Sequence, residues 1–236
     1  MSRSTSAIIP VKRLSQAKRR LASVLPAEAR RRLVMAMLQD VLDALGQVEQ
    51  IGTVLVVTPD AQVAEIARKA GASLLGESRA AGLNAAVSAG LALAQERGAT
   101  DALVLPADVP MVTPDELRRL VMTAMGRGNS QPRALLVPSH DGDGTNALLV
   151  SPPGALVPSY GPGSFVRHLA QAVARKLDVQ VLQAPGQSLG LALDIDEPRD
   201  LDRLFEHAQR SGRYAFLAAH LSKPRQAPLS MRGTSS

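Results

Sequence analysis

The chain has 236 residues, a formal net charge of +6 and no cysteine. This length suits one α/β domain with a well-buried core, and a chain without cysteine has neither disulfide nor thiolate chemistry. No apolar run is long enough to span a bilayer, and residues 1–6 lack the apolar core of a signal peptide. We therefore expect a cytoplasmic protein with no membrane partner.

The positive charge is concentrated at the two ends of the chain. Residues 1–27 carry six Lys or Arg and the stretch after Glu206 carries five, in both cases without an acid, whereas residues 28–206 hold 16 bases and 21 acids, a net charge of −5. Nucleic-acid binding needs a continuous basic surface and, for single strands, aromatic platforms. We expect no nucleic-acid partner, a local anion site in the first cluster, one domain over residues 1–213, and a basic, mobile tail over residues 214–236.

Strands and helices are predicted to alternate along the chain. In order, the patterns predict a strand at 7–9, a helix at 26–45, a strand at 53–58, a helix at 60–71, a strand at 73–75, a helix at 83–97, a strand at 102–105, a helix at 113–125, strands at 134–137 and 147–150, a helix from 164, strands at 179–182 and 191–193, and a helix at 196–210. Asp60 can cap the second helix, and Thr113-Pro-Asp-Glu116 is a capping box. The spacing predicts an α/β fold with a mostly parallel central sheet flanked by helices.

Carboxylates follow two of the predicted strands. Asp108 comes after the run 102–105, and Asp194 and Asp196 lie at the last strand, where alternation places both on one face. Open α/β sheets bind ligands at the carboxyl ends of their strands, and Mg²⁺ is held by a few carboxylates together with substrate phosphates and water. These acids can converge on one Mg²⁺. In the alternative interpretation Asp108 forms a turn and Asp196 caps the following helix.

Three loops offer groups that bind anions. The first, residues 10–21, provides Lys12 and Lys18 for a triphosphate, with an ordinary solvated basic face as the alternative. Gly161-Pro-Gly-Ser164 precedes a helix, so Ser164 can cap it while free N–H groups hold a second anion. Residues 141–146 add Thr145 and Asn146 as uncharged donors, or form a plain hairpin turn. The sequence has neither a Walker P-loop nor a Gly-x-Gly-x-x-Gly fingerprint.

One segment matches a serine-hydrolase pattern. Gly186-Gln-Ser188-Leu-Gly190 has the spacing of a nucleophile elbow, and His168 is a candidate base or a packing residue. An elbow serine lies between a strand and a following helix, whereas the run 191–193 after Ser188 is predicted as a strand. The element order therefore argues against a hydrolase.

Six motifs occur in a specific order. They are Ile9-Pro-Val-Lys12 with Ala17-Lys18-x-Arg20-Leu21, Gly82-Leu-Asn84-Ala-Ala, Leu105-Pro-Ala-Asp108-Val-Pro110, Asp143-Gly-Thr145-Asn146, Gly161-Pro-Gly-Ser164-Phe165 with His168, and Asp194-Ile-Asp196-x-Pro198-x-Asp200-Leu201. Together they resemble the phospholactate guanylyltransferase family of coenzyme F420 biosynthesis, from about residue 8 to residue 204.

The resemblance implies a Rossmann-like, GT-A-like nucleotidyltransferase fold and an enzyme that joins GMP from GTP to 2-phospho-L-lactate, phosphoenolpyruvate or 3-phospho-D-glycerate, with release of pyrophosphate. It implies the following site residues: Asp108, Lys18 and Asp196 in catalysis; Lys12, Lys18, Arg20, Gly82 and Asn84 at the nucleotide; Thr145, Asn146, Gly161 and Ser164 at the phosphorylated acid; and Asp108 and Asp196, with Asp194 as the alternative ligand, at Mg²⁺.

This chemistry needs no general base, because the attacking phosphate has a second pKa of about 6 and is already largely ionised at pH 7. A molybdenum-cofactor guanylyltransferase remains an alternative, although it would carry a Gly-rich first loop where this chain has Pro-Val-Lys-Arg. A nucleic-acid-binding protein would explain the basic ends but not the paired strand-end acids. A homodimer is one candidate assembly.

Overall fold

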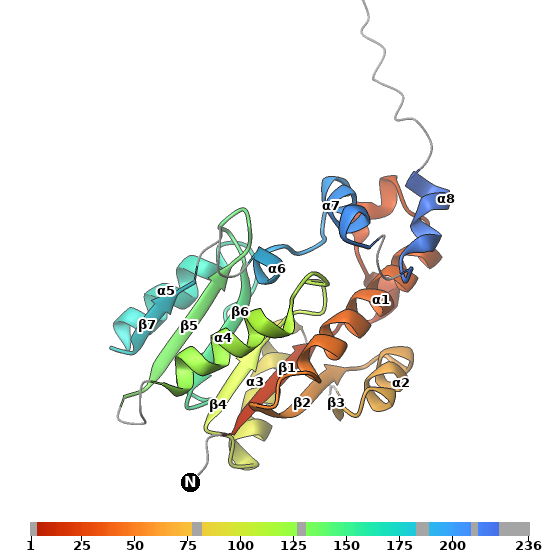
Figure 1. The fold of residues 1–236 in the computed structure, drawn as a ribbon. Coiled ribbons are helices and arrows are strands. Elements are labelled where there is room, and N and C mark those ends of the chain that lie inside the picture. Colours follow the sequence, from red (N-terminus) through yellow and green to blue (C-terminus); the bar gives the residue numbers. More distant parts are fainter. Residues whose placement is uncertain (1–3, 77–81, 127–130, 183–188, 209–211, 222–236) are drawn as a thin grey trace, which may run out of the picture.

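The structure is a computed structural model that describes residues 4–76, 82–126, 131–182, 189–208 and 212–221 (Figure 1). Within these ranges the strands are β1 (Thr5–Pro10), β2 (Ile51–Thr58), β3 (Ser73–Gly76), β4 (Asp101–Val104), β5 (Arg133–Pro138), β6 (Thr145–Ser151) and β7 (Asp178–Val181). The helices are α1 (Ala27–Leu45), α2 (Ala61–Lys69), α3 (Leu83–Glu96), α4 (Pro114–Met125), α5 (Ser164–Ala174), α6 (Leu189–Ala192), α7 (Pro198–Ala208) and α8 (Ala218–Leu221), with 3-10 turns η1 (Leu14–Gln16), η2 (Arg19–Ser23) and η3 (Ala215–Leu217).

The strands form one sheet in the order β3-β2-β1-β4-β6-β5-β7. β1 runs parallel to both β2 and β4, and β6 is antiparallel to its neighbours β4 and β5. This arrangement confirms the predicted, mostly parallel α/β sheet. The strand order reverses between β1 and β4, so their carboxyl ends border the crevice where open α/β sheets bind ligands.

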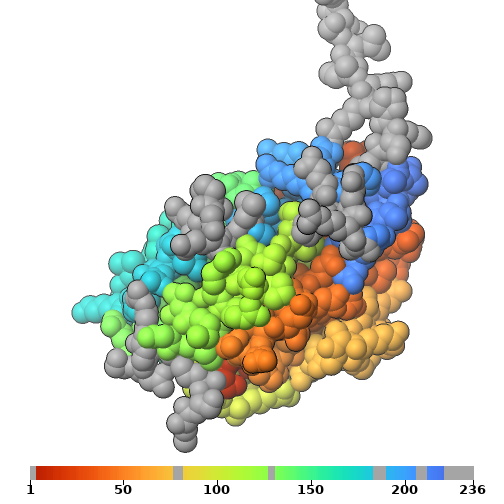
Figure 2. Space-filling model, viewed as in Figure 1, coloured from red at the N-terminus to blue at the C-terminus, as the bar shows by residue number. Residues whose placement is uncertain are grey.

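Helices cover both faces of the sheet. Side chains alternate across β1, so that Ile9 faces a core shared with α1, α2 and α4, whereas Ile8 faces a second core shared with α3 and α5. Figures 1 and 2 show α4, α1 and α2 lying over the first of these faces. Each fully buried Leu or Ile contributes about 1.5–3 kcal/mol. The two cores therefore stabilise the sheet whose strands β1 and β4 border the crevice.

Local chemistry sets several of the boundaries. The Asp60 carboxylate accepts hydrogen bonds from the first turn of α2, and Thr113 with Glu116 forms the predicted capping box of α4. Gly90 lets α3 approach β1, because a Cβ at this position would lie 2.6 Å from Cγ2 of Ile8. These local signals explain why most predicted elements agree with the observed ones.

The predicted strand at residues 191–193 is wrong, because residues 189–192 form the short helix α6. The N–H of Gly190 donates to Oε1 of Glu116 at 2.8 Å, and a Cβ at Gly190 would collide with the carbonyl oxygen of Met111. This contact with a residue 74 positions away decides the backbone conformation. A helix therefore follows Ser188, which lies outside the described residues, so the element order no longer argues against a nucleophile elbow.

The folded part of the chain extends past the expected boundary at residue 213. Tyr214 and Leu217 are buried in the core cluster that contains α1. The Tyr214 hydroxyl donates to Asp40, and Arg213 pairs with Asp40 and Asp43. At least the first residues assigned to the mobile tail therefore pack on α1, while residues 222–236 lie outside the described part. None of the helices described has the length and apolarity needed to cross a membrane.

Candidate functional site

Three loops bring opposite charges together at the carboxyl edge of the sheet. Lys18 comes from the segment after β1, Asp108 from the segment after β4, and Asp196 from the loop between α6 and α7. The Lys18 ammonium lies 2.5 Å from Oδ2 of Asp108 and 2.5 Å from Oδ1 of Asp196. The structure thus brings the three predicted catalytic residues together, across sequence separations of 90 and 178 residues.

The Lys18 backbone is held in an unfavourable conformation. Its φ of 45° and ψ of 50° are left-handed, which costs a residue other than glycine about 1–2 kcal/mol. The side chain is only 9% exposed. Burial on its own lowers the pKa of the ammonium, but the charges of Asp108 and Asp196 outweigh burial and raise the pKa above its ordinary value. Lys18 is therefore a charged group between two carboxylates.

The Asp196 carboxylate faces Lys18, and the carboxylate of Asp200 accepts the backbone N–H groups that precede α7. Oδ2 of Asp200 accepts hydrogen bonds from the backbone N–H groups of Asp196 (3.0 Å) and Glu197 (2.7 Å). The other oxygen of Asp196 lies 3.8 Å from the exposed guanidinium of Arg20. Burial raises the pKa of Asp196, but Lys18, Arg20 and the exposed Lys12 lower it overall. The helix-capping alternative for Asp196 is therefore wrong.

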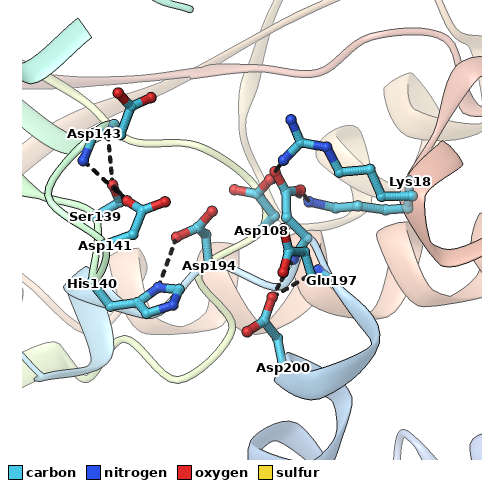
Figure 3. A network of polar contacts seen from close by, with 12 residues as sticks. Lys18, Asp108, Ser139, His140, Asp141, Asp143, Asp194, Glu197 and Asp200 are labelled. Carbon is cyan, nitrogen blue, oxygen red and sulfur yellow. Dashed lines mark hydrogen bonds and ion pairs between the residues drawn. The ribbon is translucent and has the colours of Figure 1, made fainter. Parts of the chain in front are cut away.

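Asp194 is the third carboxylate of the site, and it lies on a loop, not on the predicted strand. Its Oδ1 accepts a hydrogen bond from Nδ2 of Asn146 at 3.0 Å and lies 3.8 Å from Nδ1 of His140. Figure 3 shows Asp194 between His140 and Asp108. Burial, followed by the negative charges of Asp108 and Asp196, raises the pKa of Asp194. A further positive charge in the site would relieve this repulsion.

The predicted Mg²⁺ site can be tested against these contacts. In the part of the chain that the structure describes, no three acidic or imidazole side chains are grouped tightly enough to hold a metal by themselves. Mg²⁺ is commonly held by one or two carboxylates plus substrate phosphates and water. One oxygen each of Asp108 and Asp196 already faces a common cation, the Lys18 ammonium. The residues therefore fit a metal that is completed by substrate, provided that the ammonium moves.

Thr145 and Ser164 belong to a buried polar network around His168. Nδ1 of His168 lies 3.0 Å from Oγ1 of Thr145, and the Ser164 hydroxyl lies 3.4 Å from the same Oγ1. Nε2 of His168 accepts the N–H of Ser159 at 2.9 Å, so the neutral ring carries its proton on Nδ1. Burial and then the charge of Arg167 lower the pKa of His168 to about 4. His168 is thus a neutral structural residue whose nitrogens are both engaged.

The Gly161–Ser164 loop is held by groups of the chain itself. The N–H of Gly163 donates to Oδ1 of Asp143 at 3.0 Å, and Arg167 donates to the carbonyl of Ser159. Gly163, with φ of 69°, is the N-cap of α5, whereas Ser164 is its first residue and supplies no cap. The prediction that Ser164 caps the helix is therefore wrong. The Asp143 carboxylate accepts the N–H of Gly163, one of the N–H groups predicted to hold a second anion.

Gly82 and Asn84 lie at the start of α3, beside this loop. Oδ1 of Asn84 accepts the backbone N–H of Tyr160 at 2.6 Å, and Nδ2 donates to the Tyr160 carbonyl at 3.2 Å. Gly82 is the N-cap of α3, with φ of 105°. The structure thus joins Asn84, predicted at the nucleotide, to the residue that precedes the loop predicted at the acceptor.

Several residues that shape the site were missed at the level of sequence. Asp143 and Asp200 each belong to one of the six motifs, but the sequence around Asp143 also suits a plain turn. Arg167 and His140 carry no local signal, because the groups that they contact are brought close only by the fold. Asp194 and Asn146 were both predicted, but their mutual hydrogen bond was not.

Comparison with known proteins places the chain among related sequences. The family described as "Guanylyl transferase CofC like" matches residues 5–223. A phosphoenolpyruvate guanylyltransferase from Sphaerobacter thermophilus is 42% identical over 204 residues, which cover 86% of this chain and 94% of that protein. A 3-phospho-D-glycerate guanylyltransferase from Phenylobacterium zucineum is 37% identical over 197 residues, which cover 82% and 86% of the two chains.

Among solved structures, a nucleotidyl transferase from Methanothermobacter thermautotroptrophicus has the same fold, with a TM-score of 0.62, 18% identity, and coverage of 88% of this chain and 98% of the other. This similarity confirms the expected nucleotidyltransferase fold. The family match covers most of the chain, including all three loops that meet at Lys18. The chain therefore belongs to the CofC-like guanylyl transferase family.

Proposed function

We propose that this protein transfers GMP from GTP to a small phosphorylated acid and releases pyrophosphate, as a cytoplasmic step of coenzyme F420 biosynthesis. Family membership supports the transfer of a guanylyl group. The observation that carries the proposal is the meeting of Lys18, Asp108 and Asp196 at the sheet's switch point. A cation beside two acids at this edge suits a polyphosphate that is held through both its own charge and a metal.

The chemistry is the displacement of pyrophosphate at phosphorus. An oxygen of the acceptor phosphate forms a bond to the α-phosphorus of GTP, and the bond from that phosphorus to the bridging oxygen of the leaving pyrophosphate breaks. The acceptor needs no base at pH 7, because its second pKa is about 6. His168 agrees with this scheme, since both its ring nitrogens are occupied by the chain. Lys18, Lys12 and Arg20 would neutralise the triphosphate, which repels an anionic nucleophile.

Mg²⁺ is the cofactor we propose, with Asp108 and Asp196 as its protein ligands and Asp194 as the alternative ligand. When bound, it would screen the charge of the reacting phosphates and stabilise the departing pyrophosphate. Asn146 holds Asp194 through a hydrogen bond, and Asp200 fixes the loop that carries Asp196. These contacts keep the carboxylates oriented.

The acceptor site we propose is formed around Thr145, Gly161 and Ser164. The buried network of Thr145, Ser164 and His168 gives the start of α5 a fixed position beside Asn84 and its partner Tyr160. Side chains buried in this way act mainly by placing the backbone of the loop. The names of the relatives favour phosphoenolpyruvate, with 3-phospho-D-glycerate and 2-phospho-L-lactate as the other acceptors to compare.

The test is pyrophosphate release from GTP and Mg²⁺ with each of the three acids, followed by mass analysis of the GDP-linked product. We expect one acid to give a much higher kcat/KM than the others and a product that contains GMP and the intact acid. Asp108→Asn is the inactive control. Molybdopterin as the sole active acceptor would favour a molybdenum-cofactor guanylyltransferase, and RNA binding that persists at high salt without any pyrophosphate release would favour a nucleic-acid-binding protein.

A further inference from the structure

The Lys18 ammonium occupies the point at which Asp108 and Asp196 converge. One oxygen of each carboxylate lies 2.5 Å from Nζ. An ammonium and a divalent cation cannot both lie between the same two oxygens, since the positive charges repel and the space is filled. The metal of the proposed function, on which this inference rests, must therefore compete with a residue of the protein.

The charges show why the free protein needs a cation at this point. Asp194 is repelled by both Asp108 and Asp196, and in the described part of the site Lys18 is the cation bonded to the latter two. Arg20 approaches only one oxygen of Asp196, at 3.8 Å, and its side chain is 72% exposed. Leaving half-buried carboxylates without a partner is costly. Lys18 thus stabilises the site while it is free of ligands.

The geometry also gives a route by which Lys18 can be displaced. The Asp108 and Asp196 side chains are 28% and 43% exposed, although the Lys18 side chain that joins them is 9% exposed. A cation from solvent can therefore reach both carboxylates. Lys18 lies between the short turns η1 and η2, and its carbonyl accepts one hydrogen bond, from the N–H of Leu21 at 3.0 Å. A rotation of the Lys18 side chain away from the carboxylates leaves that backbone hydrogen bond in place.

We propose that Lys18 is an internal counter-ion that holds Asp108 and Asp196 in the free protein and releases them to the metal when a nucleoside triphosphate offers the ammonium another anion. Metal then binds weakly to the free protein and tightly together with the nucleotide. Because such coupling is reciprocal, the nucleotide also binds more tightly when the metal is present. The lysine thereby disfavours a metal bound without its substrate.

The test measures binding of Mn²⁺, as a probe for Mg²⁺, to the wild-type protein and to Lys18→Met by calorimetry and by the EPR signal of free Mn²⁺. Methionine keeps a long unbranched side chain and removes the charge. Without nucleotide, we expect Lys18→Met to bind Mn²⁺ at least about tenfold more tightly than the wild type, a coupling within the usual allosteric range. Lys69→Met is the matched control, because Lys69 pairs with Glu65 on the surface of α2, and it should bind Mn²⁺ as the wild type does.

Thermal unfolding gives a second readout. Lys18→Met should have a lower Tm than the wild type in EDTA. Saturating Mn²⁺ should raise the Tm of Lys18→Met by more than it raises the Tm of the wild type. If this variant does not fold, Lys18→Gln takes its place. Equal or weaker Mn²⁺ binding by the Lys18 variant, with Mn²⁺ still bound through Asp108, would overturn the counter-ion role but leave the proposed function intact. If no protein binds Mn²⁺, with or without a non-hydrolysable GTP analogue, both the counter-ion role and the metal site of the proposed function are rejected.

Discussion

His168 makes a quantitative prediction about stability and pH. The ring is completely buried, and burial together with Arg167 lowers its pKa from 6.5 to about 4. As the pH falls through 6.5, His168 therefore binds a proton in the unfolded chain, whereas in the folded protein it binds one only near pH 4. This contribution to stability is fully present above pH 6.5 and is lost between about pH 6.5 and pH 4.

The two pKa values set the size of the effect. Integrating the difference in bound protons from pH 7 to pH 5 gives a loss of about 2 kcal/mol in the free energy of unfolding, attributable to this one residue. We expect His168→Gln to be less stable than the wild type at pH 7, because the imidazole nitrogens that contact Thr145 and Ser159 are removed. Its stability should nevertheless fall by about 2 kcal/mol less than that of the wild type on going to pH 5.

Urea unfolding at pH 7 and pH 5 measures how much free energy of unfolding each protein loses between the two pH values. The loss for His168→Gln is then compared with the loss for the wild type. His220→Gln is the control for the loss of a histidine, because His220 lies outside the buried network around His168. The reasoning is refuted if wild type and His168→Gln lose the same free energy between the two pH values. The same variant should retain turnover per folded molecule to within about tenfold, since we assign no proton transfer to His168.

Further predictions concern turnover and binding. Asp108→Asn and Asp196→Asn should keep the fold but lose at least about a hundredfold in kcat, because a ligand charge is removed with little change in shape; near-normal turnover would exclude that residue as a ligand. Lys18→Ala should chiefly weaken the binding of GTP, whereas Ser164→Ala should chiefly raise KM for the phosphorylated acid. Equal effects of either variant on both substrates would contradict the assignment of separate sites. Ser188→Ala should leave pyrophosphate release unchanged, and a folded variant that binds GTP without turnover would revive the hydrolase interpretation.

Features that depend on neighbouring residues were predictable from the sequence. The capping box of Thr113 and Glu116 is complete within four residues, and Asp60 caps α2 through its own first turn. Strand-end acids could be grouped because the carboxyl ends of parallel strands share one edge. This rule placed Asp108, whereas Asp196 reaches the same site although the strand predicted before it is the helix α6.

Features that depend on distant partners were not predictable in this way. The short apolar run at residues 191–193 suits a strand or a helix, and the Gly190 contact with Glu116 decides between them. The sequence indicated that Lys18 and Asp108 belong to one site, but not that they bond each other in the absence of substrate. Periodicity likewise cannot show that Tyr214 packs on α1, because a single aromatic residue near the end of a chain has no pattern.

The pair of hydrogen bonds between Asn84 and Tyr160 has a mechanical consequence. The amide of Asn84 imitates a peptide group, and it couples the first turn of α3 to the backbone before α5 much as adjacent strands are coupled. When the first turn of α3 or the backbone before α5 is displaced, the two hydrogen bonds therefore cause the other segment to move with it. If guanosine binds at α3 and the acid binds at the loop before α5, binding of either substrate makes the binding site of the other more rigid. Each substrate should then raise the affinity for the other, even where the two do not touch.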